Sequence, residues 1–192
     1  MKKTLIACNI FEDEMNDVLK RRQDLEVEIV WIGAGPHNDM DRLKKSLDEA
    51  FLKADLEKGD VRVLLGGACL PDLKDLAREK GFRLLSTKKR MGALFGEKKV
   101  QELEKDKTMV ATPSWIRKTW FSADGIRSLL GWDDTDFRIN FGRCDRVLVI
   151  DFGINPLSDE EILESYSVIE APIETDSMPL EHFEKVFLDF LA

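Results

Sequence analysis

Short apolar runs alternate along the chain with stretches in which apolar residues recur every three or four positions. The runs predict buried strands at residues 4–10, 26–32, 61–65, 82–85, 108–111 and 145–152. The stretches between them predict helices around residues 11–19, 40–54, 73–77, 91–105, 126–130 and 179–191. This alternation is typical of an α/β protein with a mostly parallel sheet and helices on both of its faces, a three-layer, Rossmann-like fold.

Local signals refine the predicted elements near the end of the chain. Ser158 and Glu161 have the spacing of a capping box, which predicts the start of a helix there. Ser114 is expected to cap a helix that begins at Trp115. Residues 168–169 are expected to form a short extra strand. Since we find no internal repeat and no linker, residues 1–192 are expected to form a single α/β domain.

Composition narrows the possible partners. The chain has 29 Lys and Arg residues against 37 Asp and Glu residues, a formal charge of −8. A surplus of acid argues against nucleic-acid binding, because neutralising phosphates takes a surplus of cations. No apolar run is long enough to predict a membrane span, and the first residues do not have the pattern of a secretion signal. Three cysteines in a chain of this size predict a reducing, cytoplasmic location.

The predicted topology indicates where a ligand site should lie. In a parallel sheet the loops that follow the strands gather at one edge, and ligands bind there. The residues that follow the predicted strands are Cys8 and Asn9; Gly33, Gly35 and His37; Gly66, Gly67 and Cys69; Ser86 to Arg90; Thr112 to Trp115; and Asp151, Gly153 and Asn155.

Two thiols and one imidazole are expected at this edge. Cys8, His37 and Cys69 are suitable ligands for zinc, cobalt or iron, with one coordination position left open. Two other interpretations stay open: the cysteines are small buried hydrophobic residues, or Cys69 is a reactive thiol before a helix start. Cys144 precedes the last strand and is expected to be structural, at the opposite edge.

Two further segments are candidates for binding a cofactor or an anion. Gly66 and Gly67 lack side chains, so a ligand could approach the backbone closely there, although a plain tight turn explains them equally well. Lys88, Lys89 and Arg90 precede a predicted helix and could hold a phosphate or a carboxylate, and a solvated charge run is the alternative.

Several short motifs resemble a known family over most of the chain. They are Ala7-Cys8 before an acidic helix, Gly35-Pro36-His37-Asn38, Gly66-Gly67-Ala68-Cys69 and Thr112-Pro113-Ser114-Trp115-Ile116. The family is labelled a domain of unknown function and occurs in anaerobic prokaryotes, often encoded near corrinoid-dependent methyltransferases. The resemblance carries over Cys8, His37 and Cys69 as matching positions. The family's usual Asp-Cys pair falls where this chain has Lys88, Lys89, Arg90 and Met91.

These observations lead to three hypotheses about function. The first is a metal- or corrinoid-associated accessory protein of anaerobic one-carbon metabolism, with a corrinoid protein or methyltransferase as partner. The second is an enzyme that holds a small anionic substrate at Lys88, Lys89 and Arg90 and uses Cys69 or His37 as nucleophile or base. The third is a non-catalytic protein that docks a partner through its last helix.

Overall fold

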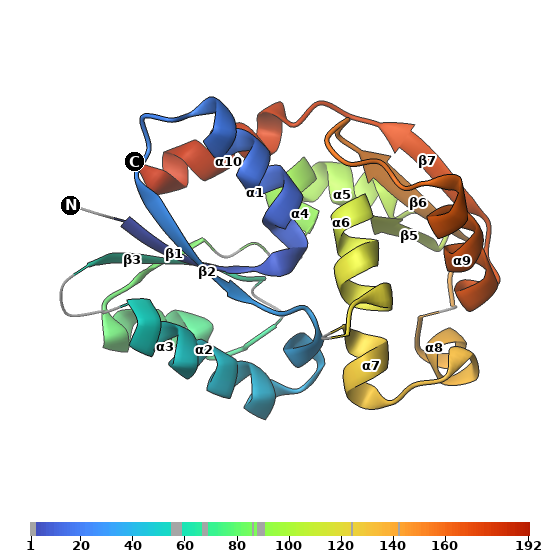
Figure 1. Ribbon diagram of the computed structural model, residues 1–192, viewed down its shortest axis with the longest axis horizontal. Coiled ribbons are helices and arrows are strands. Elements are labelled where there is room, and N and C mark those ends of the chain that lie inside the picture. Colours follow the sequence, from blue (N-terminus) through green and yellow to red (C-terminus); the bar gives the residue numbers. More distant parts are fainter. Residues whose placement is uncertain are drawn as a thin grey trace.

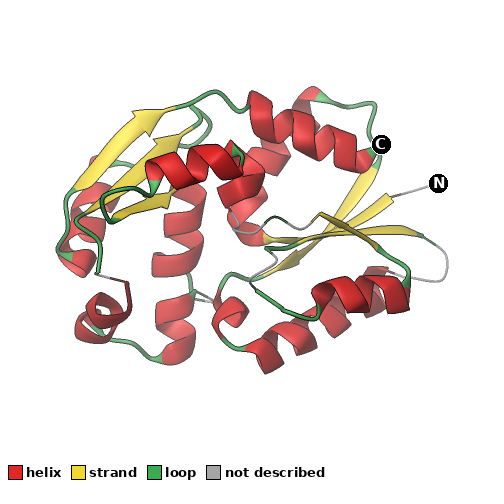
Figure 2. Cartoon of the chain, turned by 180° about the vertical axis from the view of Figure 1, so that it is seen from behind, coloured by secondary structure: helices red, strands yellow, loops and turns green. Residues whose placement is uncertain are grey.

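The strands of this protein form two parallel sheets. The computed structural model describes residues 3–54, 59–66, 69–85, 87, 91–123, 125–141 and 143–192. The first four strands form a sheet of order β2-β1-β3-β4, with β1 (Lys3–Cys8), β2 (Val27–Ile32), β3 (Asp60–Leu64) and β4 (Arg83–Leu85). The other three form a sheet of order β5-β6-β7, with β5 (Thr108–Ala111), β6 (Arg146–Asp151) and β7 (Ile173–Ser177). We call these the N-terminal and C-terminal sheets, and Figure 2 shows them as two separate groups of strands.

Every strand pair in the two sheets is parallel, as the sequence predicts. The fold class, α/β with parallel sheets flanked by helices, is therefore confirmed. The division into two sheets was not predicted, because periodicity identifies strands but carries no information about which strands pair.

Helices cover both faces of the N-terminal sheet (Figure 1). α2 (Met40–Ala54) and α3 (Leu73–Lys80) lie on one side. α1 (Glu12–Arg21) and the last helix, α10 (Glu181–Leu191), lie on the other. The C-terminal helix thus returns to the N-terminal sheet, where Phe183 stacks on Phe11 with their ring centroids 6.1 Å apart.

The remaining helices surround the C-terminal sheet or connect the two sheets. α4 (Met91–Phe95) is followed directly by α5 (Glu97–Leu103), and the break at Gly96 has a positive φ of 80°. α6 (Pro113–Ile116) continues as a π-helical turn, η3 (Arg117–Phe121). The others are α7 (Ile126–Leu130), α8 (Asp134–Phe141) and α9 (Asp159–Ile169).

The structure corrects two local predictions. Thr112, and not Ser114, is the N-cap of α6, because the Thr112 hydroxyl accepts a hydrogen bond from the Trp115 backbone N–H at 3.2 Å. Residues 168–169 are not a strand but the end of α9, and the last strand is β7. The helix boundary at Ser158 is confirmed, since both hydrogen bonds of the capping box are present.

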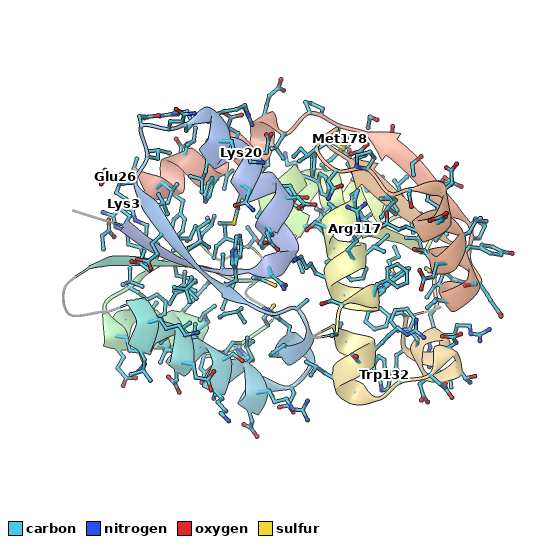
Figure 3. All side chains as sticks on the ribbon, in the orientation of Figure 1. Lys3, Lys20, Glu26, Arg117, Trp132 and Met178 are labelled. Atoms are coloured by element: carbon cyan, nitrogen blue, oxygen red, sulfur yellow. The ribbon has the colours of Figure 1, made fainter. Side chains whose placement is uncertain are left out.

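An aromatic cluster occupies the stretch that is least regular in sequence. Trp120 and Phe137 pack edge to face at 5.2 Å, and Phe137 stacks on Phe141 at 4.8 Å. Trp132, which lies between α7 and α8 (Figure 3), also packs against both phenylalanines. This cluster joins α8 to η3 and so supports one wall of the site described below.

No helix within the described ranges is long and apolar enough to cross a membrane.

Candidate functional site

The sequence-predicted metal ligands follow three adjacent strands of the N-terminal sheet. β1 lies between β2 and β3, and Cys8 is its last residue, in register with Ile32 of β2. His37 lies in a short 3-10 helix, η2 (Gly35–Asn38), after β2, and Cys69 lies in the turn after β3. Strand order therefore brings all three residues to the same edge of one sheet.

Their side chains differ in exposure. Cys8 is only 1% exposed, whereas Cys69 is half-buried. His37 is half-buried too, and both of its ring nitrogens are shielded from solvent. Among the residues that the structure describes, which include these three, no group of three or more His, Cys, Asp or Glu side chains is arranged to hold a metal ion. The donor types suit zinc, but the arrangement does not assemble a ligand set, so the metal role stays a prediction.

The predicted cofactor-binding segments are only partly described. Gly66 lies two residues after the end of β3 and is buried, and its carbonyl accepts a hydrogen bond from the Cys69 backbone N–H at 2.9 Å. Gly67, Lys88, Lys89 and Arg90 lie outside the described residues, so the anion-binding prediction stays a prediction.

A second group of polar side chains lies where the carboxyl ends of the two sheets meet. An inner pocket is lined by residues at or after the ends of β1, β5 and β6, among them Asp13, Glu14, Ser114, Asp151 and Asn155. An outer pocket shares Asp13, Ser114 and Asn155 with it and adds Arg117, Lys118, Phe121 and Ser122. We call the two together the inter-sheet crevice. Crevices at the carboxyl ends of parallel strands are the usual ligand sites of α/β proteins.

Glu14 is the most unusual residue of the crevice. It lies in the first turn of α1 and its side chain is buried, with a relative exposure of 2%. Burial, which removes water from the ionised carboxylate, raises the pKa of Glu14 to about 8, and the charge of Asp13 adds to the rise. Hydrogen bonds from its own backbone N–H and from Thr112 act in the opposite direction. Glu14 is therefore mostly protonated at neutral pH and can gain or lose a proton near it.

Several buried polar atoms on the elements that form the crevice have no hydrogen-bond partner among the described residues. Glu14 Oε2 and Ser114 Oγ are two of them, and both side chains line the inner pocket. Three more lie on η1 (Asn9–Phe11) and η3 and line neither pocket: Asn9 Oδ1, Thr119 Oγ1 and Trp120 Nε1. Because an unpaired buried polar group costs about 1–3 kcal/mol, the two that line the inner pocket indicate a surface built to meet a ligand or bound water.

Arg117 fixes the outer wall of the crevice. Its guanidinium forms a two-point ion pair with Glu161, with N···O distances of 2.6 and 2.8 Å. It also donates to the backbone carbonyls of Asn155 and Pro156, and thereby holds the loop after β6 against η3. The guanidinium lowers the pKa of Glu161, which keeps that carboxylate ionised. Figure 3 shows Arg117 beside α6, in the middle of the molecule.

The wall that carries Arg117 is itself irregular. η3 is a π-helical turn, a conformation that is rare and that often occurs at functional sites. It directs Arg117, Lys118 and Phe121 to the outer pocket, while Thr119 and Trp120 are buried behind it.

Sequence reasoning placed Ser114, Asp151 and Asn155 at strand ends but did not identify Glu14. One signal was present: Glu14 lies three residues after Phe11 and four before Val18, so it falls on the apolar face of the helix. A carboxylate on a buried face is a candidate functional group.

The fold and this site define a parallel α/β protein with a polar crevice between two sheets. Residues 31–187 match the model of a protein family of unknown function, DUF1638, and the chain belongs to that family. A comparison with curated proteins found no match.

Proposed function

We propose that this protein binds a small ligand in the inter-sheet crevice. The observation that supports the proposal is the pair of buried polar atoms, Glu14 Oε2 and Ser114 Oγ, which belong to residues that line the inner pocket and have no hydrogen-bond partner among the described residues. The outer pocket has a cavity volume of about 330 Å³, which lies within the range of small-molecule sites. A group that titrates near neutral pH would let the crevice exchange a proton with its ligand.

A screen of small amines, alcohols and carboxylates by protein NMR tests this function. Ligands of the crevice should shift the backbone amide signals of Ser114 and Asn155, and leave that of Glu49, which is exposed on α2, unchanged. The proposal fails if no compound class shifts the crevice signals selectively. It also fails if Ser114→Leu, which fills the inner pocket, leaves such shifts unaltered.

We further propose a role as a metal- or corrinoid-associated accessory protein of anaerobic one-carbon metabolism, acting in the cytoplasm. Its support is the resemblance described above and the strand order, which brings Cys8, His37 and Cys69 to one edge. A corrinoid protein or methyltransferase is the corresponding partner. Metal at this edge would require the three side chains to move together, since they do not converge in the structure.

Anaerobic purification followed by metal analysis and an absorbance scan for corrinoid tests this association. The expected result is about one metal or corrinoid per chain, lost in Cys69→Ser and kept in Cys144→Ser, because Cys144 precedes β6 at the far end of its strand. Thiolate and imidazole ligands must be deprotonated, so affinity should fall on acidification. Equal metal content in both variants, or none in the native chain, contradicts the association.

The structure bears differently on the other two hypotheses from the sequence, an enzyme with an anionic substrate and a protein that docks a partner. An enzyme that holds an anionic substrate with Lys88, Lys89 and Arg90 depends on residues outside the described part of the chain. Rapid alkylation of Cys69 that a phosphorylated metabolite blocks would favour it. Docking through α10 is less favoured, because Phe183, Phe187 and Leu191 of that helix are buried in the core.

A further inference from the structure

The two parts of the crevice differ strongly in size. The inner pocket has a cavity volume of about 10 Å³, against about 330 Å³ for the outer pocket. A volume of about 10–15 Å³ is what a single water molecule needs. The inner pocket therefore admits a head group of one heavy atom, while the rest of a ligand fits in the outer pocket.

The charges around the inner pocket favour a cation. Asp13 and Asp151 line the pocket itself, and Asp13 is the charged neighbour that acts on Glu14. Two cations lie nearby: Arg117 pairs with Glu161 and also lies 3.9 Å from Asp13, and Lys118 pairs with Glu12. These two cations face four described carboxylates, those of Asp13, Asp151, Glu12 and Glu161. The local charge is therefore negative, and a positive head group is stabilised there.

The polar atoms favour an ammonium group over a metal ion. An ammonium group has three N–H donors and no acceptor. Glu14 Oε2 and Ser114 Oγ offer two acceptors that have no partner among the described residues, and the Asp151 carboxylate lines the same pocket. The described carboxylates do not converge as metal ligands would, whereas an ammonium group needs only acceptors within hydrogen-bond reach.

We propose that the inner pocket binds the primary ammonium group of a small organic ligand, whose remaining atoms lie in the outer pocket. This inference rests on the proposed ligand-binding function of the crevice. Glu14 releases its proton to solvent when the already protonated ammonium enters, and its Oε2 then accepts a hydrogen bond from the ammonium N–H. The titratable groups that face this exchange are Asp13 on α1, Asp151 at the end of β6, and the ion pairs of Arg117 with Glu161 and Asp13 and of Lys118 with Glu12.

Titration of the full chain with n-butylammonium, followed by amide chemical shifts at pH 7 and pH 9, tests the proposal. An alkylamine stays protonated over this range, as lysine does. Since the pKa of Glu14 is about 8, the ionised fraction of Glu14 grows between pH 7 and pH 9. The affinity for n-butylammonium should therefore be about tenfold higher at pH 9 than at pH 7. Butyltrimethylammonium, whose head group exceeds the inner pocket, should bind at least about tenfold more weakly.

Variants separate the ammonium site from surface charge. Glu14→Gln should weaken n-butylammonium binding at least about tenfold at pH 9 and abolish the pH dependence. Glu49→Gln removes an exposed acid from α2 and should change neither. If Glu14→Gln fails to fold, Ser114→Ala replaces it, with an expected loss of a few-fold in affinity.

The outcomes distinguish this proposal from the function on which it rests. If 1-butanol or butyrate shifts the crevice signals and n-butylammonium does not, the crevice binds ligands but the ammonium assignment is wrong. Equal binding of n-butylammonium and butyltrimethylammonium also overturns it. If neither these probes nor the wider screen shifts the crevice signals, the ligand-binding function itself fails.

Discussion

Glu14 shows how one buried carboxyl group can define a site in a protein whose other polar residues lie mostly at the surface. Its position on the apolar face of α1 breaks the pattern of that helix, and a hydrophobic residue there would pack without an unpartnered oxygen. Such local conflicts are expected at functional sites, where stability is given up for chemistry. The raised pKa of Glu14 makes this cost measurable.

Glu14 should make the protein less stable as the pH rises. The pKa of Glu14 is about 8 in the folded chain and about 4.5 for an unperturbed carboxyl, so the folded state binds the extra proton. The resulting stabilisation is fully present below pH 4.5 and is lost as the pH rises through 8. Between pH 5 and 8 the free energy of unfolding should fall, relative to that of Glu14→Gln, by up to about 1.4 kcal/mol per pH unit.

Urea denaturation of the native chain and of Glu14→Gln between pH 5 and 8 measures this difference in the free energy of unfolding, and Glu49→Gln is the control. An advantage of the native chain over Glu14→Gln that grows with pH would show that Glu14 is ionised in the folded protein.

At the scale of elements, a capping motif predicted the start of a helix reliably only where both of its hydrogen-bonding residues were present in the sequence. The Ser158–Glu161 capping box predicts the start of α9, because both partners of the motif lie within four residues. Near α6, two hydroxyl residues compete for the cap, and the sequence does not distinguish Thr112 from Ser114. β7 escaped prediction because its sequence, Ile173–Ser177, is mostly exposed and polar and has no apolar run.

Ser158→Ala should lower the free energy of unfolding by about 1 kcal/mol, because the mutation leaves the Glu161 backbone N–H without its acceptor. The measurement is the midpoint of the urea unfolding transition, compared between proteins whose free energies of unfolding depend on urea with the same slope. Ser167→Ala is the matched control: Ser167 is exposed in the same helix and its hydroxyl only donates to the Glu164 carbonyl. Equal losses in both variants would contradict a capping role.

At the scale of the whole molecule, the C-terminal helix ties the end of the chain to its beginning. Arg62 of β3, 1% exposed, donates to the carbonyl of Phe190, and Lys3 of β1 donates to that of Leu191. Phe187 is fully buried and stacks on Phe183 with their ring centroids 5.4 Å apart. The N-terminal sheet is therefore incomplete until the last residues are in place.

Phe187→Ala should cost about 3–5 kcal/mol, because it opens a cavity between α10 and the N-terminal sheet. Lys185→Ala, at an exposed position of the same helix, should change the free energy of unfolding by no more than about 0.5 kcal/mol. Urea unfolding followed by circular dichroism measures both. A loss below about 1 kcal/mol for Phe187→Ala would show that α10 packs only loosely on the sheet.

The fold class and most of the elements could be predicted from the amino-acid sequence, because burial on a strand or on one helix face leaves a periodic pattern of apolar residues. The sequence also placed Cys8, His37 and Cys69 after three strands, and strand order then made these positions neighbours. Only the tertiary structure divided the strands into two sheets, returned α10 to the first of them, and buried Glu14 against Thr112 and Ser114. These features depend on contacts between residues far apart in the chain, and such contacts leave no periodic trace in one sequence.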